Sequence, residues 1–323
     1  MAQPAMPLFR RIRRPLVRTA RCLGLVPSRR EDPYDRRFDS LEVSPAVAAA
    51  AERMRGTLHP PAVWILGVMP RSGTVYTGEL IRLHPQVYAY PNQMWELPLP
   101  ELSGDLLQAQ ERFFALFEHN RERMARHDFL RLSGGAFMAY LLGFVPDGRT
   151  ALFKVPDVRY LRHFETWFPG ERLLLLLRDG RDVVASTLKT WPQKSFRRVA
   201  QQWSRATHLA LDYATYRERR GDPVPVWKYE DIVRDPHAFA RWACDAYDLP
   251  PDRYPWDEID RLPLRGASSV HAPGTVTWEP VSLAERPRTT GKWVSWTRRQ
   301  KRVFQAIAGD ALQRAGYVSG ASW

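Results

Sequence analysis

The sequence predicts an α/β fold, in which a doubly wound, mostly parallel β-sheet carries helices on both faces. Apolar runs at Val63–Val68, Ala151–Val155 and Arg172–Leu177 have the length and composition of strands that are covered on both faces. Segments with helical periodicity separate these runs, as parallel strands require. The 323 residues suffice for one large domain of this class, and the chain has no internal repeat.

Local signals place the remaining elements. Pro45–Arg55 is rich in alanine, and the pair Pro60-Pro61 separates this helix from the first strand. His84-Pro85 ends the helix that follows the first strand, and Gly316 ends the last helix. The predicted helices are Pro45–Arg55, Thr74–Leu83, Arg181–Trp191, Phe196–Arg219, Pro236–Tyr247 and Thr297–Ala315, and two further strands are Val87–Tyr90 and Val224–Tyr229.

The chain divides into a tail and one domain. Residues 1–39 are rich in arginine and hold no acidic residue before Glu31, so we expect a basic, flexible N-terminal tail. Residues 40–323 form a single domain, in which a helical region at about 92–148 interrupts the alternation of strands and helices. We expect this insertion to be a helical cap. The arginines of the tail are Arg10, Arg11, Arg13, Arg14, Arg18, Arg21, Arg29 and Arg30.

The charge balance favours an anionic partner. Lys and Arg outnumber Asp and Glu by 48 to 35, which gives a net charge of +13 and suggests nucleic acid, a membrane surface or a small polyanion. The tail could lie on an anionic membrane as a short basic amphipathic helix, although Pro15 interrupts the pattern, or it could remain a solvated arm.

Several classes of protein are disfavoured. No stretch reaches the roughly 18 continuous apolar residues that a membrane span needs, and the tail lacks the apolar run of a secretory signal. Cys22 and Cys244 lie far apart in unlike contexts, so neither a disulfide framework nor a zinc site is indicated. We therefore expect a cytoplasmic protein without a transmembrane segment.

The segment GVMPRSGTVYTGEL, residues Gly67–Leu80, joins a predicted strand to a predicted helix through a glycine turn. Because successive backbone N–H groups can face an anion in this layout, it predicts a P-loop-like cradle for phosphate or sulfate. It is not a Walker A loop, since Thr74 rather than lysine follows Gly73. Arg71 adds a permanent cation whose planar fork can hold two oxygens. The alternative is an ordinary turn with a surface arginine.

A second signal lies in the segment RLLLLLRDGRDVVAS. Arg178 closes a predicted central strand, and Ser186 follows it eight residues later, near the start of the next helix. Both side chains can therefore converge on one phosphate. In the alternative interpretation, Arg178 pairs with Asp182 and Ser186 merely faces a neighbouring helix.

Together these motifs resemble those of the sulfotransferases that depend on 3′-phosphoadenosine 5′-phosphosulfate (PAPS), in the form seen in the Golgi, tyrosylprotein and many bacterial branches. The resemblance implies transfer of a sulfuryl group from PAPS, which leaves 3′-phosphoadenosine 5′-phosphate (PAP). It also implies that Arg178 and Ser186 hold the 3′-phosphate. Val75 departs from a more frequent threonine, so that one hydroxyl contact is lost. The residues implied at the 5′-phosphosulfate are Arg71, Ser72, Gly73, Thr74 and Val75.

Weaker matches extend the resemblance across most of residues 60–317. Lys154 in FKVPD resembles the family lysine that reaches the sulfuryl group and the bridging oxygen. Tyr229 matches a tyrosine that approaches the adenine end of PAPS. The stretch RPRTTGKW looks like the C-terminal segment whose basic residues close over the 3′-phosphate. Further candidates for cofactor binding are Arg286 and Arg288 in this stretch, and Arg265 and Ser268 in PLRGASS.

The general base is not indicated by a family motif. Pro156 occupies the place of the histidine that the cytosolic branch uses, and Asn92 occupies the place of the glutamate of the tyrosylprotein branch. The nearest carboxylate is Glu96, for which we expect an apolar setting that raises its pKa and suits it to accept a proton. A surface or N-capping role is the alternative. Lesser candidates are His84, His127 and Asp128.

The sequence thus predicts a sulfotransferase that acts on a hydroxyl or amine of a small-molecule, glycan or peptide acceptor, with Arg71, Lys154 and Glu96 as catalytic residues. We expect no metal requirement and no nucleic-acid partner, because no acidic metal-binding constellation and no recognised nucleic-acid module is seen. The predicted cap at 92–148 would bind the acceptor. Two alternatives are a small-molecule kinase with a degenerate P-loop and a non-enzymatic polyanion-binding module. The acceptor and the oligomeric state do not follow from the sequence, although Trp95, Trp191 and Trp203 could line an acceptor site.

Overall fold

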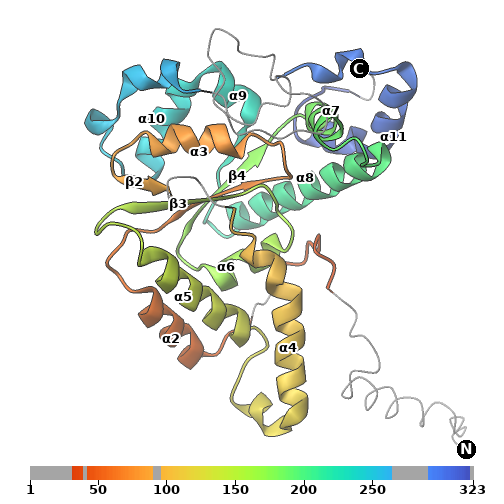
Figure 1. Ribbon diagram of the computed structural model, residues 1–323. Helices are drawn as coiled ribbons and strands as arrows, with labels where there is room; N and C mark the ends of the chain where they lie inside the picture. The colour runs from red at the N-terminus through yellow and green to blue at the C-terminus, as the bar shows by residue number, and fades with distance from the viewer. Residues whose placement is uncertain (1–30, 39–41, 90–95, 264–289, 321–323) are drawn as a thin grey trace, which may run out of the picture.

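The centre of the protein is a parallel β-sheet (Figure 1). The computed structural model describes residues 31–38, 42–89, 96–263 and 290–320. In this part of the chain, five strands pair in the order β2-β3-β1-β4-β5, and every pairing is parallel. The predicted doubly wound sheet is therefore confirmed. The strands are β1 (Val63–Gly67), β2 (Val87–Ala89), β3 (Thr150–Val155), β4 (Arg172–Leu177) and β5 (Val226–Lys228).

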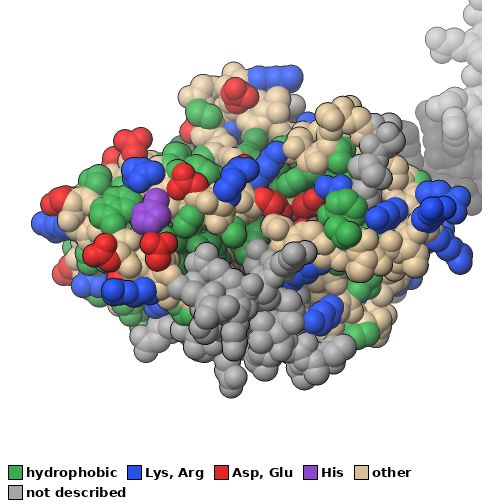
Figure 2. Space-filling view, turned by 90° about the horizontal axis from the view of Figure 1, so that it is seen from above, with side chains coloured by type: hydrophobic (Ala, Val, Ile, Leu, Met, Phe, Trp, Pro, Cys, Tyr) green, Lys and Arg blue, Asp and Glu red, His purple; other side chains and the backbone are tan. Residues whose placement is uncertain are grey.

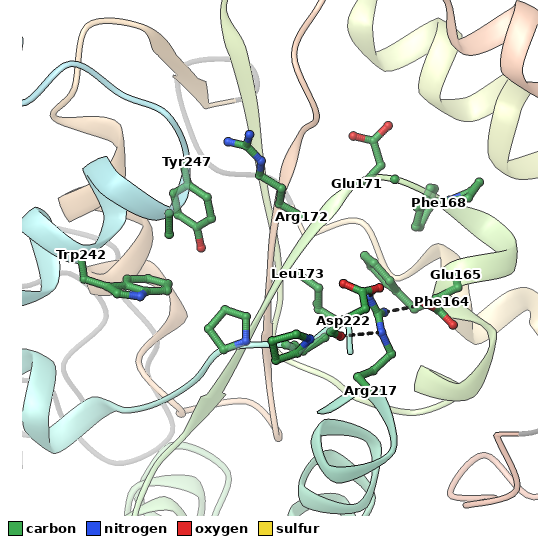
Figure 3. A pocket seen from close by; sticks show the side chains of 16 residues that line it. Phe164, Glu165, Phe168, Glu171, Arg172, Leu173, Arg217, Asp222, Trp242 and Tyr247 are labelled. Atoms are coloured by element: carbon green, nitrogen blue, oxygen red, sulfur yellow. Dashed lines mark hydrogen bonds and ion pairs between the residues drawn. The ribbon is translucent and has the colours of Figure 1, made fainter. Parts of the chain in front are cut away.

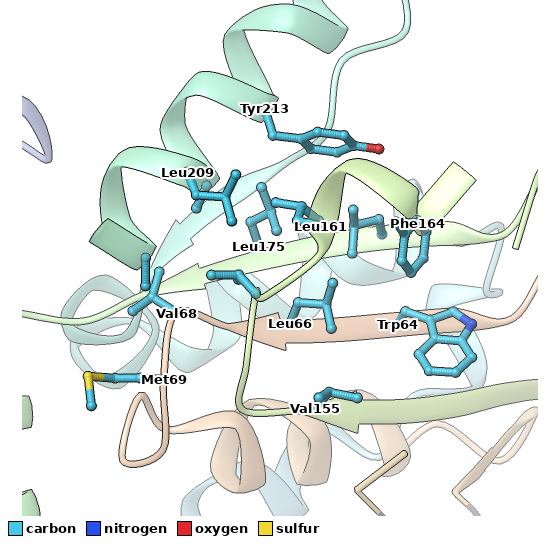
Figure 4. Packing of buried hydrophobic residues seen from close by; sticks show 14 of the residues in the cluster. Trp64, Leu66, Val68, Met69, Val155, Leu161, Phe164, Leu175, Leu209 and Tyr213 are labelled. Atoms are coloured by element: carbon cyan, nitrogen blue, oxygen red, sulfur yellow. The ribbon is translucent and has the colours of Figure 1, made fainter. Parts of the chain in front are cut away.

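Alternation along the central strands creates two hydrophobic cores, one on each face of the sheet. Val63 and Ile65 of β1 belong to one core, which lies under helices α3 (Thr74–Arg82) and α10 (Pro236–Ala246). Trp64 and Leu66 point to the opposite face, where Figure 4 shows them with Leu175, Leu161 and Phe164. Both faces of the strands are thus buried, which explains their continuous apolar sequences.

The second core is covered by several helices that the sequence places far apart. Leu209 and Tyr213 of α8 pack onto this face (Figure 4). Because these helices contribute a single apolar stripe each, the sheet is the surface on which they bury it. The elements on this side are α5 (Asp128–Leu142), α6 (Phe164–Trp167), α7 (Gly180–Thr190), α8 (Phe196–Arg219) and α11 (Arg298–Arg314).

The region at 92–148 is largely helical where it is described, and its helices are separate elements and not one continuous helix. Helix α4 (Ser103–Leu116) stops because Phe117 is extended, with φ of −151°. The 3₁₀ turn η2 (Glu118–Glu122) and helix α5 follow, and α5 packs against α2 (Pro45–Arg55). A role of this region in acceptor binding remains a prediction.

Strand β5 differs from the prediction at its carboxyl end. The sequence predicts a strand to Tyr229, whereas the structure ends β5 at Lys228 and begins helix α9 (Tyr229–Arg234) there. β5 is a three-residue strand at the sheet edge, so only one neighbour holds it extended. The consequence for the site is that Tyr229 opens a helix instead of closing a strand.

Residues 31–38 correct the boundary of the predicted flexible tail. Phe38 is buried against Tyr213, and the Asp35 carboxylate lies 2.6 Å from the Arg162 guanidinium. Glu31 also bonds to the buried His163, at 2.9 Å. These residues therefore belong to the folded domain, and the arginine-rich residues 1–30 lie outside the described residues. No helix in the described part of the chain is both long and apolar enough to cross a membrane.

Candidate active site

The two predicted anion-binding motifs meet at one edge of the sheet. β1 and β4 are neighbours, with Gly67 in register with Leu176, so the segments that follow them lie side by side. The first segment is the loop that leads into α3, and the second contains Arg178 and leads into α7. Both helices begin at this edge, and helix N-termini attract anions. The carboxyl edge of a doubly wound sheet is also where ligands of such folds bind.

The loop after β1 is held in a tight conformation by its own atoms. The Ser72 hydroxyl donates to the Met69 carbonyl at 2.7 Å and accepts from the Met69 N–H at 3.3 Å. Arg71 and Gly73 both have positive φ, at 78° and 95°. For arginine this backbone is unfavourable, and strain of this kind is typical of functional sites. Ser72, predicted to contact the phosphosulfate, therefore has a structural task in shaping the loop.

Both the positive φ of Gly73 and the nearby Tyr229 ring require glycine at this position. A Cβ at this position would lie 2.1 Å from the ring of Tyr229, closer than any real contact allows. The Tyr229 ring also meets Tyr76 edge-on. Thr74 is buried at the first position of α3, and Val75 after it is partly buried. Four of the five predicted contact residues thus follow Arg71 around the turn between β1 and α3.

Arg71 connects the two motifs directly. Its Nε donates to the Ser186 Oγ on α7 at 3.0 Å. Its backbone carbonyl accepts from Nη1 of Arg178 at 2.7 Å. The Arg178 guanidinium in turn lies over the Tyr229 ring, 4.5 Å from its centroid. The structure therefore brings Arg71, Arg178, Ser186 and Tyr229 into one cluster.

Lys292 joins this cluster, although it is not among the residues predicted from the sequence. Burial, followed by the charges of Arg178 and Arg71, lowers the pKa of Lys292 to about 8. Burial and the charge of Arg178 also lower the pKa of Arg71 to about 10. The charge of Arg178 thus acts on both Arg71 and Lys292, and three cationic side chains lie close together. This arrangement fits a site for a polyanion, because bound negative charge would relieve that repulsion.

The segment that carries Lys292 is fixed to the start of α7. The Asp182 carboxylate accepts hydrogen bonds from the backbone N–H groups of Gly291 at 2.8 Å and of Lys292 at 2.6 Å. Arg181 lies over the Trp293 ring, 4.0 Å from its centroid. The sequence signal for this contact is the stretch RPRTTGKW, in which the prediction named Arg286 and Arg288 instead of Lys292. Asp182 therefore anchors the Lys292 segment, which differs from the pairing with Arg178 considered as an alternative.

Lys154 and Glu96 form a pair at the end of β3. The Lys154 Nζ lies 3.1 Å from Oε1 of Glu96, and the two residues form an isolated parallel bridge. The Lys154 side chain is 4% exposed, whereas that of Glu96 is 48% exposed. The apolar setting predicted for Glu96 is therefore wrong, because the carboxylate is half exposed and faces an ammonium group. The Glu96 carboxylate nevertheless lies beside Lys154, the predicted catalytic lysine.

The lesser candidates for a base have structural roles. His84 Nδ1 accepts from the Gln86 N–H at 3.1 Å, and its Nε2 lies 3.0 Å from the Pro250 carbonyl. His127 accepts from the Glu42 N–H at 3.0 Å, and burial lowers its pKa to about 4. Asp128 accepts from both the N–H and the hydroxyl of Ser44. All three side chains are buried, so none is presented to an acceptor.

Some predicted residues cannot be placed. Arg265, Ser268, Arg286 and Arg288 lie outside the described residues, and so does Trp95. Of the other candidate acceptor-site tryptophans, Trp203 is a core residue whose Nε1 donates to the Arg178 carbonyl at 3.1 Å. Trp191 ends α7 and lies under the Lys194 ammonium, 4.3 Å from the ring centroid.

A model of the sulfotransferase family matches residues 61–253, which is more than half of the chain. The chain belongs to the sulfotransferase family. The matched range contains both anion-binding motifs together with Lys154 and Tyr229. The predicted enzyme class, sulfuryl transfer, is confirmed, and the kinase and the non-enzymatic polyanion-binding module lose their support.

Three solved structures with some likeness to this sulfotransferase are sulfotransferases by name. The sulfotransferase domain of the Synechococcus PCC 7002 olefin synthase is 20% identical, with a TM-score of 0.46 over 78% of this chain and 96% of that one. Mouse sulfotransferase SULT7A1 complexed with PAP is 12% identical, with a TM-score of 0.46 over 85% and 92%. Sulfotransferase STF9 from Mycobacterium avium is 19% identical, with a TM-score of 0.40 over 72% and 82%. Likenesses of this degree add nothing to the family match. No curated protein sequence matches the chain significantly.

Two surface features complete the description of this sulfotransferase. On the face in Figure 2, Lys and Arg side chains are interspersed with Asp and Glu, so this face is not a continuous basic surface. A hollow of about 600 Å³ opens at the amino ends of β4 and β5, between Arg172, Trp242 and Tyr247 (Figure 3). Because Arg71 and Arg178 follow the carboxyl ends of the strands, this hollow lies at the opposite edge of the sheet from the motifs.

Proposed function

We propose that this sulfotransferase takes its sulfuryl group from PAPS and passes it to a hydroxyl or amine of a small-molecule, glycan or peptide acceptor. One observation carries the proposal. Arg71, Arg178 and Lys292 surround the carboxyl ends of β1 and β4, where burial, followed by the neighbouring positive charges, lowers the pKa values of Arg71 and Lys292. PAPS carries anionic groups at two separate positions, which suits three cations on three segments that meet at this edge of the sheet.

The cluster offers a distinct group to each end of PAPS. Arg71 and the turn Ser72–Val75 would hold the 5′-phosphosulfate, with backbone N–H groups at the start of α3. Arg178, Ser186 and Lys292 would hold the 3′-phosphate. Tyr229 would border the adenine. The Arg71–Ser186 hydrogen bond of 3.0 Å supports a continuous site for both groups.

PAPS would supply an activated sulfuryl group, and the chain would supply positioning and charge. Arg71 and Lys154 would stabilise the negative charge that develops on the oxygens around sulfur, because fixed cations in a water-poor site act strongly on such charge. Glu96 would accept the proton that the acceptor hydroxyl or amine loses. For this step the carboxylate must face the acceptor, and its 48% exposure supports that access.

A cytoplasmic location, a single domain that includes residues 31–38 and a cap that binds the acceptor are proposals. We also propose that transfer needs no metal ion, since a sulfuryl group carries less negative charge than a terminal phosphate and fixed cations suffice to stabilise it. No group of three or more His, Cys, Asp and Glu side chains suited to a metal occurs among the described residues.

Binding of PAP tests the donor. PAP at a hundredfold excess over its dissociation constant should stabilise the protein by about 2.7 kcal/mol, whereas ATP with magnesium should have a much smaller effect. The measurement is thermal unfolding at increasing concentrations of each nucleotide. A larger shift with ATP and magnesium, and none with PAP, would contradict PAPS as the donor. A screen of acceptor classes with labelled PAPS then identifies the acceptor.

Glu96→Gln tests the base. The substitution keeps the size of the side chain and a hydrogen-bond acceptor for Lys154, but removes the proton acceptor. The PAP dissociation constant should remain within about twofold, while kcat falls by roughly 10² to 10⁴, most strongly for acceptors of high pKa. A matched control is Glu101→Gln, a nearby carboxylate that pairs with Arg159 at 2.7 Å. Full activity of the Glu96 variant would remove this residue from the mechanism but leave the sulfotransferase assignment intact.

A further inference from the structure

The peptide unit between Arg178 and Asp179 is held by side chains at both of its polar atoms. The Arg178 carbonyl accepts from Nε1 of Trp203 at 3.1 Å, and the Asp179 N–H donates to Oε1 of Glu230 at 3.0 Å. The second oxygen of Glu230, Oε2, accepts from the Tyr317 hydroxyl at 3.1 Å. This unit is the point where β4 ends and α7 begins, next to the guanidinium of Arg178.

Glu230 is linked to both members of the cation–π pair that Arg178 forms with Tyr229. It follows Tyr229 in the chain, so the residue that carries the ring and the residue that fixes the Arg178 backbone are neighbours at the start of α9. The Arg178 guanidinium lies 4.5 Å from the centroid of that ring. The position of the cation relative to the ring therefore depends on the Glu230–Asp179 hydrogen bond.

Tyr317 extends this support to the turn after α11. The turn is fixed by the Lys228 Nζ, which donates to the Gly316 carbonyl at 3.0 Å and lies 4.8 Å from the Tyr317 ring centroid. Lys228 ends β5, immediately before Tyr229. The junction of β5 and α9 and the C-terminal turn thus fix each other, and the phenol is held where it can donate to Glu230.

The electrostatic setting shows that Glu230 acts as an acceptor and not as half of an ion pair. No cationic side chain lies within 4 Å of its carboxylate among residues 31–38, 42–89, 96–263 and 290–320. Burial raises the pKa of Glu230, against the opposing effects of the Asp179 N–H and the Arg178 charge. Asp179, the nearest anion, is occupied by Arg181 at 2.6 Å. The Glu230 carboxylate thus accepts hydrogen bonds from the Asp179 backbone N–H and from the Tyr317 hydroxyl.

We propose that Glu230 and Tyr317 are positioning residues of the cofactor site, which hold the Arg178–Asp179 peptide and thereby place the Arg178 guanidinium for the 3′-phosphate of PAPS. The inference rests on the proposed function, since it assigns Arg178 to PAPS. Tyr317, in the turn after α11, would then support Arg178, which lies more than 100 residues earlier in the sequence. Neither residue touches the reacting atoms.

The experiment measures the PAP dissociation constant by calorimetry in single and double variants. Glu230→Ala leaves the buried Asp179 N–H without its acceptor and should weaken PAP binding on the order of tenfold, with a similar rise in KM for PAPS and a smaller change in kcat. Tyr317→Phe should weaken it about threefold. Glu230→Gln should restore binding to within about threefold, because the amide can accept from Asp179 and donate to the Tyr317 oxygen.

A double-mutant cycle separates positioning from general stability. If Glu230 acts through Arg178, adding Glu230→Ala to Arg178→Ala should change the PAP dissociation constant by less than about twofold. A matched control is Tyr247→Phe at the opposite edge of the sheet, whose buried hydroxyl has no hydrogen-bond partner among the described residues. Its PAP affinity should equal that of the unmodified protein. If Glu230→Ala does not fold, the Tyr317→Phe and Arg178→Ala cycle gives the same decision.

The outcomes distinguish this inference from the proposed function. If the unmodified protein does not bind PAP, the donor assignment fails. If it binds PAP but a folded Glu230→Ala protein binds equally tightly, the positioning role fails while the donor assignment stands. An equal loss from Glu230→Ala with and without Arg178 also overturns the positioning role, because the effect would then not pass through that side chain.

Discussion

Lys292 gives the cofactor site a pH dependence that can be calculated from the structure. Its pKa is lowered to about 8 by burial and then by Arg178, Arg71 and Lys189, while Asp182 opposes the shift. A bound polyanion would favour the ammonium form and raise this pKa again. PAP should therefore bind more tightly when Lys292 is protonated, and its affinity should fall as Lys292 loses its proton.

The size of the effect follows from linkage. With a pKa of about 8 in the free protein, Lys292 is about 90% protonated at pH 7 and about 10% protonated at pH 9. If the pKa in the complex lies above 10, the PAP dissociation constant should rise about tenfold between these two pH values. Arg71, with a pKa of about 10, contributes mainly above pH 9. The stability of the free protein should move the opposite way, because the unfolded chain binds more protons than the folded one between pH 8 and the ordinary lysine pKa.

Calorimetric titration of PAP at pH 7, 8 and 9 measures the slope, and thermal unfolding without ligand measures the stability. Lys292→Arg should bind PAP with little change over this range, since the guanidinium stays charged. Lys292→Ala should also lose the slope, with binding on the order of tenfold weaker at pH 7. A flat profile in the unmodified protein, or the same slope in Lys292→Arg, would refute the assignment of this titration to Lys292.

Three further substitutions and one deletion probe other parts of the molecule. Gly73→Ala should abolish PAP binding, because its Cβ would lie 2.1 Å from the Tyr229 ring at a φ of 95°, and tight binding by a folded variant would contradict this packing. Arg178→Ala should raise KM for PAPS by one to two orders of magnitude, whereas Lys154→Ala should chiefly lower kcat, and steady-state kinetics that show the reverse would exchange their roles. Deleting residues 1–30 should preserve turnover of a soluble acceptor but reduce retention on anionic vesicles, and loss of PAP binding in the folded truncation would place the tail in the site.

The sheet could be predicted because its signals are local. The runs Val63–Val68 and Arg172–Leu177 are apolar on both faces, and the structure uses them as two neighbouring interior strands, β1 and β4. Helix Phe196–Arg219 was also predicted with its observed ends. The start of α9 could not be predicted in the same way, since Tyr229 follows an edge strand of three residues whose end depends on tertiary contacts.

The sequence indicates which side chains lie together where they follow the ends of neighbouring strands, but not where tertiary contacts decide. Arg71, Arg178 and Ser186 meet because β1 and β4 pair. Lys292 reaches them only because Asp182 binds its backbone N–H, a contact between residues that the sequence separates by 110 positions. The setting of Glu96 was predicted from its apolar neighbours in sequence, but the bridge to Lys154 places it beside a cation instead.

The conformation of Arg71 shows how the two motifs become one site. A left-handed backbone at a residue other than glycine costs on the order of 1 to 3 kcal/mol, and Arg71 adopts it with φ of 78°. Two hydrogen bonds from the second motif hold the residue there, one to its carbonyl from Arg178 and one from its Nε to Ser186. Both bonds depend on the position of β4 beside β1. The strained residue and its cation are therefore held by the pairing of the two strands, so the two motifs make one anion site only in the assembled sheet.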